Sequence, residues 1–135
     1  MPSLYLFDTN TVSAIMADHS NVKARLAVKP GKIVTCAIVR GEVRYGLERL
    51  PAGKRRTNLE NKASAVFATL AIEPVTMAAA DIYGAIRRSL ELKGQNVSDN
   101  DLWIAATALS LGAVLVSNDH AFSYVPGLSV EDWTT

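Results

Sequence analysis

The chain is poor in the residues that zinc sites and disulfides require. Its 135 residues include one cysteine, Cys36, and two histidines, His19 and His120. A lone cysteine cannot close an internal disulfide, and Cys36 lies in an apolar stretch, so we expect a small buried hydrophobic residue in a reducing compartment. Neither histidine has the spacing of a zinc ligand, and surface roles are expected for both.

Long apolar runs and a strong net charge are also absent. No stretch reaches the roughly 20 apolar residues of a membrane span, and the first ten residues lack the pattern of a signal peptide. We therefore expect a cytoplasmic protein without membrane contact. The net charge is +1 at pH 7, so any nucleic-acid binding must come from a local patch. Without repeats or linkers, residues 1–135 are expected to form a single domain.

Short apolar stretches alternate with amphipathic segments along the chain. Strands are expected over residues 3–8, 32–35, 71–75, 113–119 and 128–133. Helices are expected over residues 9–20, 21–28, 35–49 with Thr35 as cap, a segment that begins within 50–56 and runs to about 70, 76–94, and 98–112. This alternation predicts a three-layer α/β/α fold around a central, mainly parallel sheet of four or five short strands.

Acidic residues occupy special places in this pattern. Asp8 and Asp119 close two predicted strands, Asp99 and Asp101 open a predicted helix, and Glu42 lies on a largely apolar helix face. Ligands of parallel sheets sit beyond the carboxyl ends of the strands. Several carboxylates become tolerable at one point when a hard cation such as Mg²⁺ or Mn²⁺ lies among them. Such ions clamp phosphoryl oxygens and activate water, so the acids favour phosphoryl chemistry.

Every one of these acids also has a structural interpretation as a helix cap, a turn residue or half of a surface ion pair. The specific alternatives are a cap by Asp8, a variant capping box of Ser98 with Asp101, a favourable dipole contact of Asp99, a turn at Asn118-Asp119, and an ion pair of Glu42 with Arg49. Individually the signals are weak, and only their joint placement favours the functional interpretation.

Four segments, in this order along the chain, resemble those of the PIN-domain ribonucleases. They are "LFDTN", "VRGEVRYGL", "SDNDLWIAATAL" and "VLVSNDHAFSYVPGLSVEDW". More narrowly, they resemble the toxins of VapBC-type toxin–antitoxin modules, and the similarity spans nearly the whole chain. It implies a Mg²⁺- or Mn²⁺-dependent endoribonuclease, a hydrolase that cuts phosphodiester bonds in structured RNA, tRNA especially.

The resemblance also implies a set of site residues. Its catalytic acids are Asp8, Glu42, Asp101 and Asp119. Asp8, Asp101 and Asp119 would hold the metal, and Glu42 would position or deprotonate the attacking water. The family often carries asparagine at the position of Asp119, so the resemblance supports this ligand less than the other two. Supporting roles fall to three polar residues nearby, Asn10, Asp99 and Ser117.

Partners follow from the same resemblance. It implies a homodimer and a cognate antitoxin whose tail enters the active-site groove, with operator DNA bound only through that antitoxin. Because four acids repel RNA, cations must offset them. Arg40 and Arg44, which flank Glu42, are the first candidates for substrate binding, and the others are Lys54, Arg55, Arg56, Arg87 and Arg88. The alternative for each cation is a solvated helix face with ordinary ion pairs.

Rival functions remain at this stage. A phosphotransferase of the haloacid-dehalogenase kind would need an acid at Asn10 and a lysine late in the chain at a strand end, and the sequence has neither. A receiver-like domain fails similarly. A catalytically silent PIN-like binding module and an α/β protein whose acids only cap helices stay open.

Overall fold

The computed structural model describes residues 4–28 and 30–135. Its strands are β1 (Leu4–Phe7), β2 (Lys32–Cys36), β3 (Ala71–Glu73), β4 (Val114–Val116) and β5 (Val130–Glu131). Its helices are α1 (Thr9–Met16), α2 (Ser20–Ala27), α3 (Ala37–Glu48), α4 (Lys54–Ala68), α5 (Met77–Leu92), α6 (Asp99–Leu111) and the 3-10 helix η1 (His120–Tyr124). Ser3, where the first strand was predicted to begin, lies outside the described residues.

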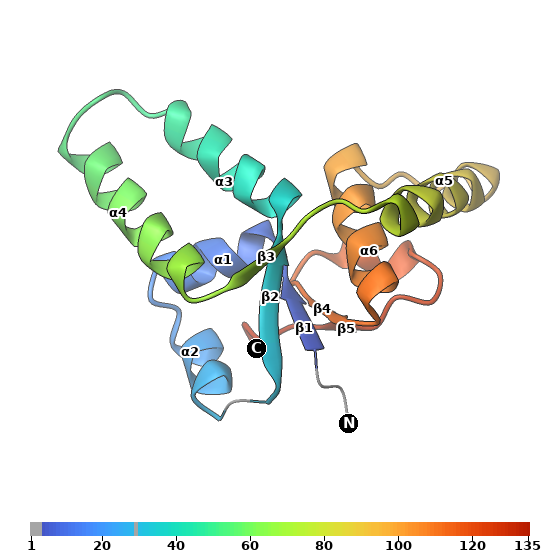
Figure 1. The fold of residues 1–135 in the computed structure, drawn as a ribbon, viewed down its shortest axis with the longest axis horizontal. Coiled ribbons are helices and arrows are strands. Elements are labelled where there is room, and N and C mark those ends of the chain that lie inside the picture. The colour runs from blue at the N-terminus through green and yellow to red at the C-terminus, as the bar shows by residue number, and fades with distance from the viewer. Residues whose placement is uncertain (1–3, 29) are drawn as a thin grey trace.

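The five strands form one sheet in the order β3-β2-β1-β4-β5, and every pairing is parallel. Helices α1 to α4 lie on one side of the sheet, and α5 and α6 lie on the other (Figure 1). This division follows from right-handed crossovers, because the chain moves outward from β1 to β3 and then returns to β4 on the other side of β1. The predicted α/β/α fold is confirmed, and the direction of strand order reverses between β1 and β4.

The core surrounds β1, the central strand. Leu6 and Phe7 are fully buried, and the ring of Trp133 packs on this strand with its centroid 5.3 Å from that of Phe7. Against the same core lies α6, whose buried side chains include Ile104, Ala105 and Ala106. Among the described residues, no helix is both long and apolar enough to span a membrane.

One predicted helix boundary is wrong. Thr35 does not cap α3, because it lies within β2 and its hydroxyl donates to the carbonyl of Phe7 at 2.8 Å. A hydroxyl buried between strands needs such a partner, and the neighbouring backbone supplies it. Cys36 occupies the cap position without a side-chain hydrogen bond, and it is buried as expected. The third strand also ends at Glu73, before the Pro74 that the predicted strand included.

Candidate active site

The carboxyl ends of β1 and β4 bring Asp8 and Asp119 to one place. Phe7 pairs with Val116 across these neighbouring strands, and the backbone N–H of Asp8 donates to the carbonyl of Val116 at 3.2 Å. Asp8 is only 3% exposed. Burial raises the pKa of its carboxyl, hydrogen bonds from Ser117 and Thr11 oppose the rise, and the charge of Asp119 adds to it.

Asp8 directly follows β1, whereas β4 ends at Val116 and does not extend to Asp119 as predicted. Both aspartates are helix caps. One oxygen of Asp8 accepts the backbone N–H of Thr11 at 2.8 Å and caps α1, and Asp119 accepts that of Ala121 at 2.9 Å and caps η1. The cap considered for Asp8 is therefore confirmed, whereas Asp119 caps η1 instead of forming the turn considered for Asn118-Asp119. A cap does not compete with the functional interpretation, because a carboxylate has two oxygens and the cap fixes one of them in orientation.

Asp101 enters from the first turn of α6. Its backbone N–H donates to the hydroxyl of Ser98, the cap of this helix, at 3.3 Å. Burial raises the pKa of the Asp101 carboxyl, a hydrogen bond from Ser98 opposes the rise, and the charges of the acids at 119, 42 and 8 add to it. Asp101 therefore lies within electrostatic reach of the other three acids, near the point where strand order reverses.

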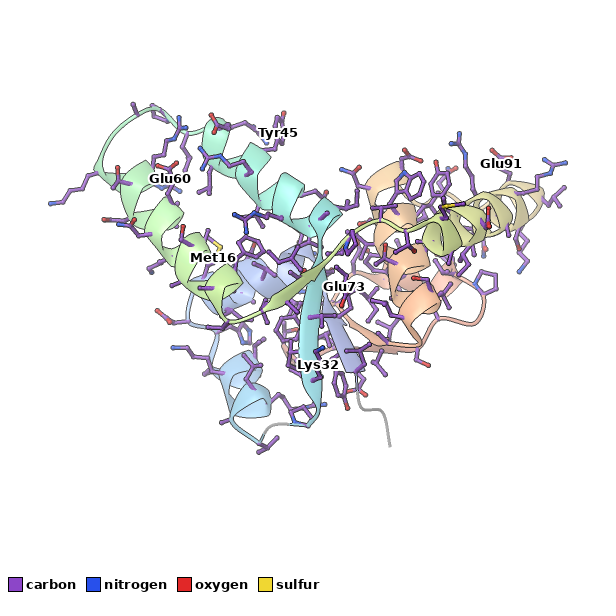
Figure 2. All side chains as sticks on the ribbon, viewed as in Figure 1. Met16, Lys32, Tyr45, Glu60, Glu73 and Glu91 are labelled. Atoms are coloured by element: carbon purple, nitrogen blue, oxygen red, sulfur yellow. The ribbon has the colours of Figure 1, made fainter. Side chains whose placement is uncertain are left out.

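Glu42, from α3, is held by the two other helices at the site. The hydroxyl of Thr9 donates to its Oε1 at 2.5 Å, and the side-chain amide of Asn100 donates to its Oε2 at 3.3 Å. Glu42 forms no ion pair in the part of the chain that the structure describes, and Arg49 instead lies over the ring of Tyr45, which points outward from α3 (Figure 2). The alternative pairing of Glu42 with Arg49 is not what the structure shows.

Three polar side chains connect the loops around this cluster. Ser117 is buried, and its hydroxyl accepts the backbone N–H of Asp119 at 2.9 Å in addition to lowering the pKa of Asp8. The side-chain amide of Asn10 donates to that of Asn118 at 3.1 Å, which ties α1 to the loop after β4. The sequence pattern indicates Asn118 only as a turn residue, and it does not indicate Thr9 or Asn100 as site residues. Each of these three residues is nevertheless the immediate neighbour of a predicted catalytic acid in the sequence.

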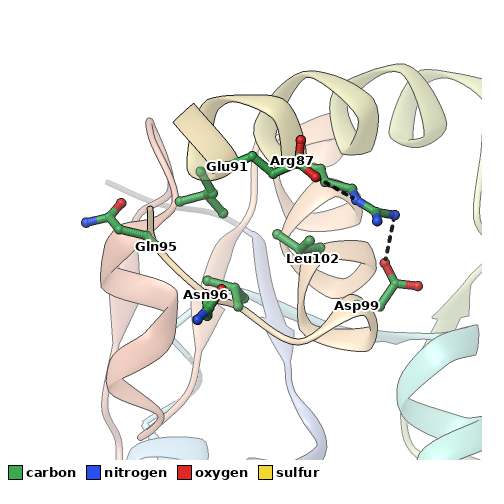
Figure 3. A pocket seen from close by; sticks show the side chains of 8 residues that line it. Arg87, Glu91, Gln95, Asn96, Asp99 and Leu102 are labelled. Atoms are coloured by element: carbon green, nitrogen blue, oxygen red, sulfur yellow. Dashed lines mark ion pairs between the residues drawn. The ribbon is translucent and has the colours of Figure 1, made fainter. Parts of the chain in front are cut away.

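Asp99 does not join the other acids. Its carboxylate accepts the hydroxyl of Tyr83 from α5. It also lies 3.7 Å from the guanidinium of Arg87 on the same helix, and Figure 3 shows this ion pair. Residues that are two positions apart on a helix point in directions about 200° apart. Asp99 and Asp101 therefore leave α6 on nearly opposite sides. Asp99 instead lines a cavity of about 300 Å³ between α5 and α6, with Arg87 and Leu102 among its walls.

Arg40 and Arg44 are not brought to the acid cluster either. Each lies two residues from Glu42, on nearly the opposite side of α3. The guanidinium of Arg40 lies 5.2 Å from the ring of Phe67, and Arg44 pairs with Glu48 and, at 3.0 Å, with Glu60. Figure 2 shows Glu60 on α4, facing this side of the helix pair. Both arginines thus serve the contact between α3 and α4.

The chemistry of these acidic side chains suits a metal ion better than their present spacing does. Within residues 4–28 and 30–135, no three Asp, Glu, His or Cys side chains already stand close enough together to hold an ion. The groups that face one another are nevertheless all carboxylates, the ligands that Mg²⁺ and Mn²⁺ prefer. Burial and repulsion raise the pKa of Asp8 and Asp101, and a positive charge between these carboxylates would favour their charged forms. The chemistry of these donors therefore suits a hard divalent cation.

Comparison with known proteins agrees with this geometry. The family model of the PIN domain matches residues 5–128. Ribonuclease VapC2 of Rickettsia felis is 29% identical over 134 residues, which cover 96% of this chain and 98% of the relative. The tRNA(fMet)-specific endonuclease VapC of Salmonella typhimurium is 29% identical over 131 residues, which cover 96% and 97% of the two chains.

A solved structure of VapBC2 from Rickettsia felis, bound to a DNA fragment from its promoter, has a similar fold. Its matching chain superposes with a TM-score of 0.88 at 28% identity, and the match covers 96% of this chain and 98% of that one. The family model thus spans the whole arrangement of strand-end acids described above. The chain belongs to the PIN domain family.

Proposed function

We propose that this protein is a Mg²⁺- or Mn²⁺-dependent endoribonuclease that acts as the toxin of a toxin–antitoxin pair. The observation that carries the proposal is the gathering of Asp8, Glu42, Asp101 and Asp119 at the strand ends, where burial and the other three charges raise the pKa of Asp101. A carboxylate cluster with Asp8 buried and the other acids partly exposed, at the reversal of strand order, suits cation-assisted phosphoryl chemistry. Relatives that are named ribonucleases support the same reaction class.

In this proposal Asp8, Asp101 and Asp119 hold the cation. A bound divalent cation supplies a Lewis acid that neutralises charge on the phosphoryl oxygens and makes water easier to deprotonate. Glu42 positions the attacking water and accepts its proton, with Thr9 and Asn100 fixing the direction of its carboxylate through their hydrogen bonds. Ser117 keeps the Asp8 carboxyl oriented between the strands.

The proposed substrate is structured RNA, with tRNA first, because one relative is a tRNA(fMet)-specific endonuclease. The direct test is incubation of the purified protein with a mixed tRNA pool in Mn²⁺, Mg²⁺ or EDTA. We expect discrete cleavage products with either cation and none in EDTA. RNA that is bound but never cut would instead identify a catalytically silent binding module, and cleavage that persists in EDTA would overturn the metal requirement.

We further propose that an antitoxin binds beside the acid cluster, as the VapBC complexes among the solved relatives suggest. A groove of about 420 Å³ runs between α1, α3 and α4, and its wall includes Thr9 and Glu42. The rest of this wall is mainly apolar, with Met16, Leu47 and Leu50 among its residues. An antitoxin tail with apolar side chains would fill it and cover Glu42. The toxin would act as a homodimer, and the antitoxin alone would contact operator DNA.

Filling this groove is expected to weaken antitoxin binding. Gly46 on α3 lines the groove, and a Cβ atom built there meets no atom within 4 Å, so the side chain of Gly46→Phe can leave α3 without a clash at Cβ. We expect at least a 10-fold loss of affinity for the antitoxin encoded beside the toxin, measured by calorimetry. Gly41→Phe is the matched control, since Gly41 has the same free space on α3 but does not line the groove. Equal affinities of the two variants would place the antitoxin elsewhere.

A further inference from the structure

The cations of α4 divide into two groups. Arg56 is half-buried and pairs with Glu48 at 3.0 Å and Glu60 at 3.8 Å, in the same network as Arg44. The remaining cations of this helix are Lys54, Arg55 and Lys62, all exposed, and among the described residues none of them takes part in an ion pair. We call these three residues the basic edge of α4.

The basic edge lines one shallow groove. Its volume is about 620 Å³, and the side-chain amides of Asn58 and Asn61 share its wall with the three cations. Arg55 and Lys62 are seven residues apart, so they lie on the same side of α4, two turns or about 10 Å from each other. Cations and amides spaced along one groove are the donors that phosphate oxygens accept from.

This groove adjoins the apolar groove beside the candidate active site. Lys62 lines both grooves, and the wall of the apolar one includes Thr9 and Glu42. Asp18 is within electrostatic range of Lys62, and it already pairs with Lys23 at 2.7 Å. Lys23 first, and Lys62 at longer range, lower the pKa of Asp18. Lys62 therefore brings positive charge to a groove that Glu42 also lines.

We propose that the basic edge of α4 binds the phosphate backbone of the RNA strand where it leaves the acid cluster past Glu42. This inference rests on the proposed nuclease function, because it assigns the substrate's path at that site. Four acids repel a polyanion, and cations in an adjoining groove offset the repulsion without occupying the site itself. Such contacts position a strand and carry no base specificity. An antitoxin in the neighbouring apolar groove would cover Lys62 and so block this path.

The test measures RNA affinity without cleavage, in an Asp101→Asn background. The triple variant Lys54→Gln, Arg55→Gln and Lys62→Gln is titrated with a mixed tRNA pool across salt concentrations, by fluorescence anisotropy. Loss of three single-strand phosphate contacts should lower the slope of log K against log salt by about 2, at about 0.7 per contact. We expect at least a 10-fold loss of affinity near 0.1 M salt.

The control carries the same charge change elsewhere. Lys32→Gln, Arg88→Gln and Lys93→Gln alter exposed cations on β2, on α5 and directly after α5. If this control weakens RNA binding and lowers the salt slope as much as the α4 variant does, the basic edge is not the RNA surface. Unchanged RNA affinity with weakened antitoxin binding would also overturn the proposal and make the edge a protein surface. Failure of the unmutated protein to cut RNA in Mn²⁺ would remove the nuclease function separately, leaving the affinity result to stand.

Discussion

Asparagine in place of Asp101 is expected to reduce metal-dependent RNA cleavage at least about 100-fold, since loss of even an outer partner of a metal ligand costs roughly 10- to 100-fold. The change keeps the size of the side chain and leaves the Ser98 cap on the backbone N–H in place. It removes the charge that shares the cluster with the acids at 8, 42 and 119. The measurement is the single-turnover cleavage rate of a tRNA pool in Mn²⁺.

The same helix offers a matched control. Asp99→Asn makes the identical chemical change two residues earlier, where the carboxylate contacts Tyr83 and Arg87 instead of the other acids. We expect cleavage within about twofold of the unmutated protein. If both variants lost activity equally, Asp99 would belong to the catalytic set after all. If Asp101→Asn kept full activity, the cleavage would come from a contaminant or from other residues.

Asp8→Asn is expected to abolish cleavage while raising the melting temperature of the metal-free protein by a few degrees at pH 7. Asp8 is 3% exposed, and its carboxylate is disfavoured by burial and by the charge of Asp119. Asparagine keeps a carbonyl oxygen that can accept the N–H of Thr11, so the cap of α1 remains. The variant therefore removes a buried charge and leaves its structural hydrogen bond.

The pH dependence gives this prediction a definite sign. The pKa of Asp8 is raised above its ordinary value of 3.8, so between the two values the folded protein binds more protons than the unfolded chain. The stability contributed by this group is fully present below pH 3.8 and is lost as pH rises through the folded-state pKa. The advantage of Asp8→Asn in EDTA should thus be smallest in acid and grow toward neutral pH, as followed by thermal melts.

Divalent cations should reverse the order of the melting temperatures of the unmutated protein and Asp8→Asn. An ion at about 100 times its Kd adds about 2.7 kcal/mol to the free energy of unfolding of a protein that binds it only when folded. We expect Mn²⁺ to raise the melting temperature of the unmutated protein and to leave Asp8→Asn nearly unchanged. Equal stabilisation of both proteins would remove Asp8 from the ligand set. A lower melting temperature of the variant in EDTA at pH 7 would contradict the cost assigned to the buried charge.

Much of the site was predictable from local sequence. Asp8 and Asp119 end two apolar stretches, and parallel strands place their carboxyl ends on one edge of the sheet, so their proximity followed from the α/β alternation. Ser98 signalled the start of α6 through its capping chemistry, and the alternation predicted the parallel sheet that the structure shows. These features depend on residues close in sequence, or on a rule that holds for the whole fold class.

The direction in which each side chain points was not predictable. Asp99 and Asp101 look equivalent in the sequence, but α6 packs against α5 in a rotation that turns Asp99 to Arg87 and Asp101 to the acids. In the same way, the packing of α3 against α4 assigns Arg44 to Glu60 and leaves the basic edge free.

The sequence by itself determined the order of elements, the identity of the acids and their places at strand and helix ends, because apolar periodicity and capping act between residues a few positions apart. Only the tertiary structure decided that Thr9 and Asn100 hold Glu42. It also decided that Lys62 lines both the groove of the basic edge and the apolar groove between α1, α3 and α4. Those contacts join helices distant in sequence, and their register is fixed by how the helix faces bury against the sheet and one another.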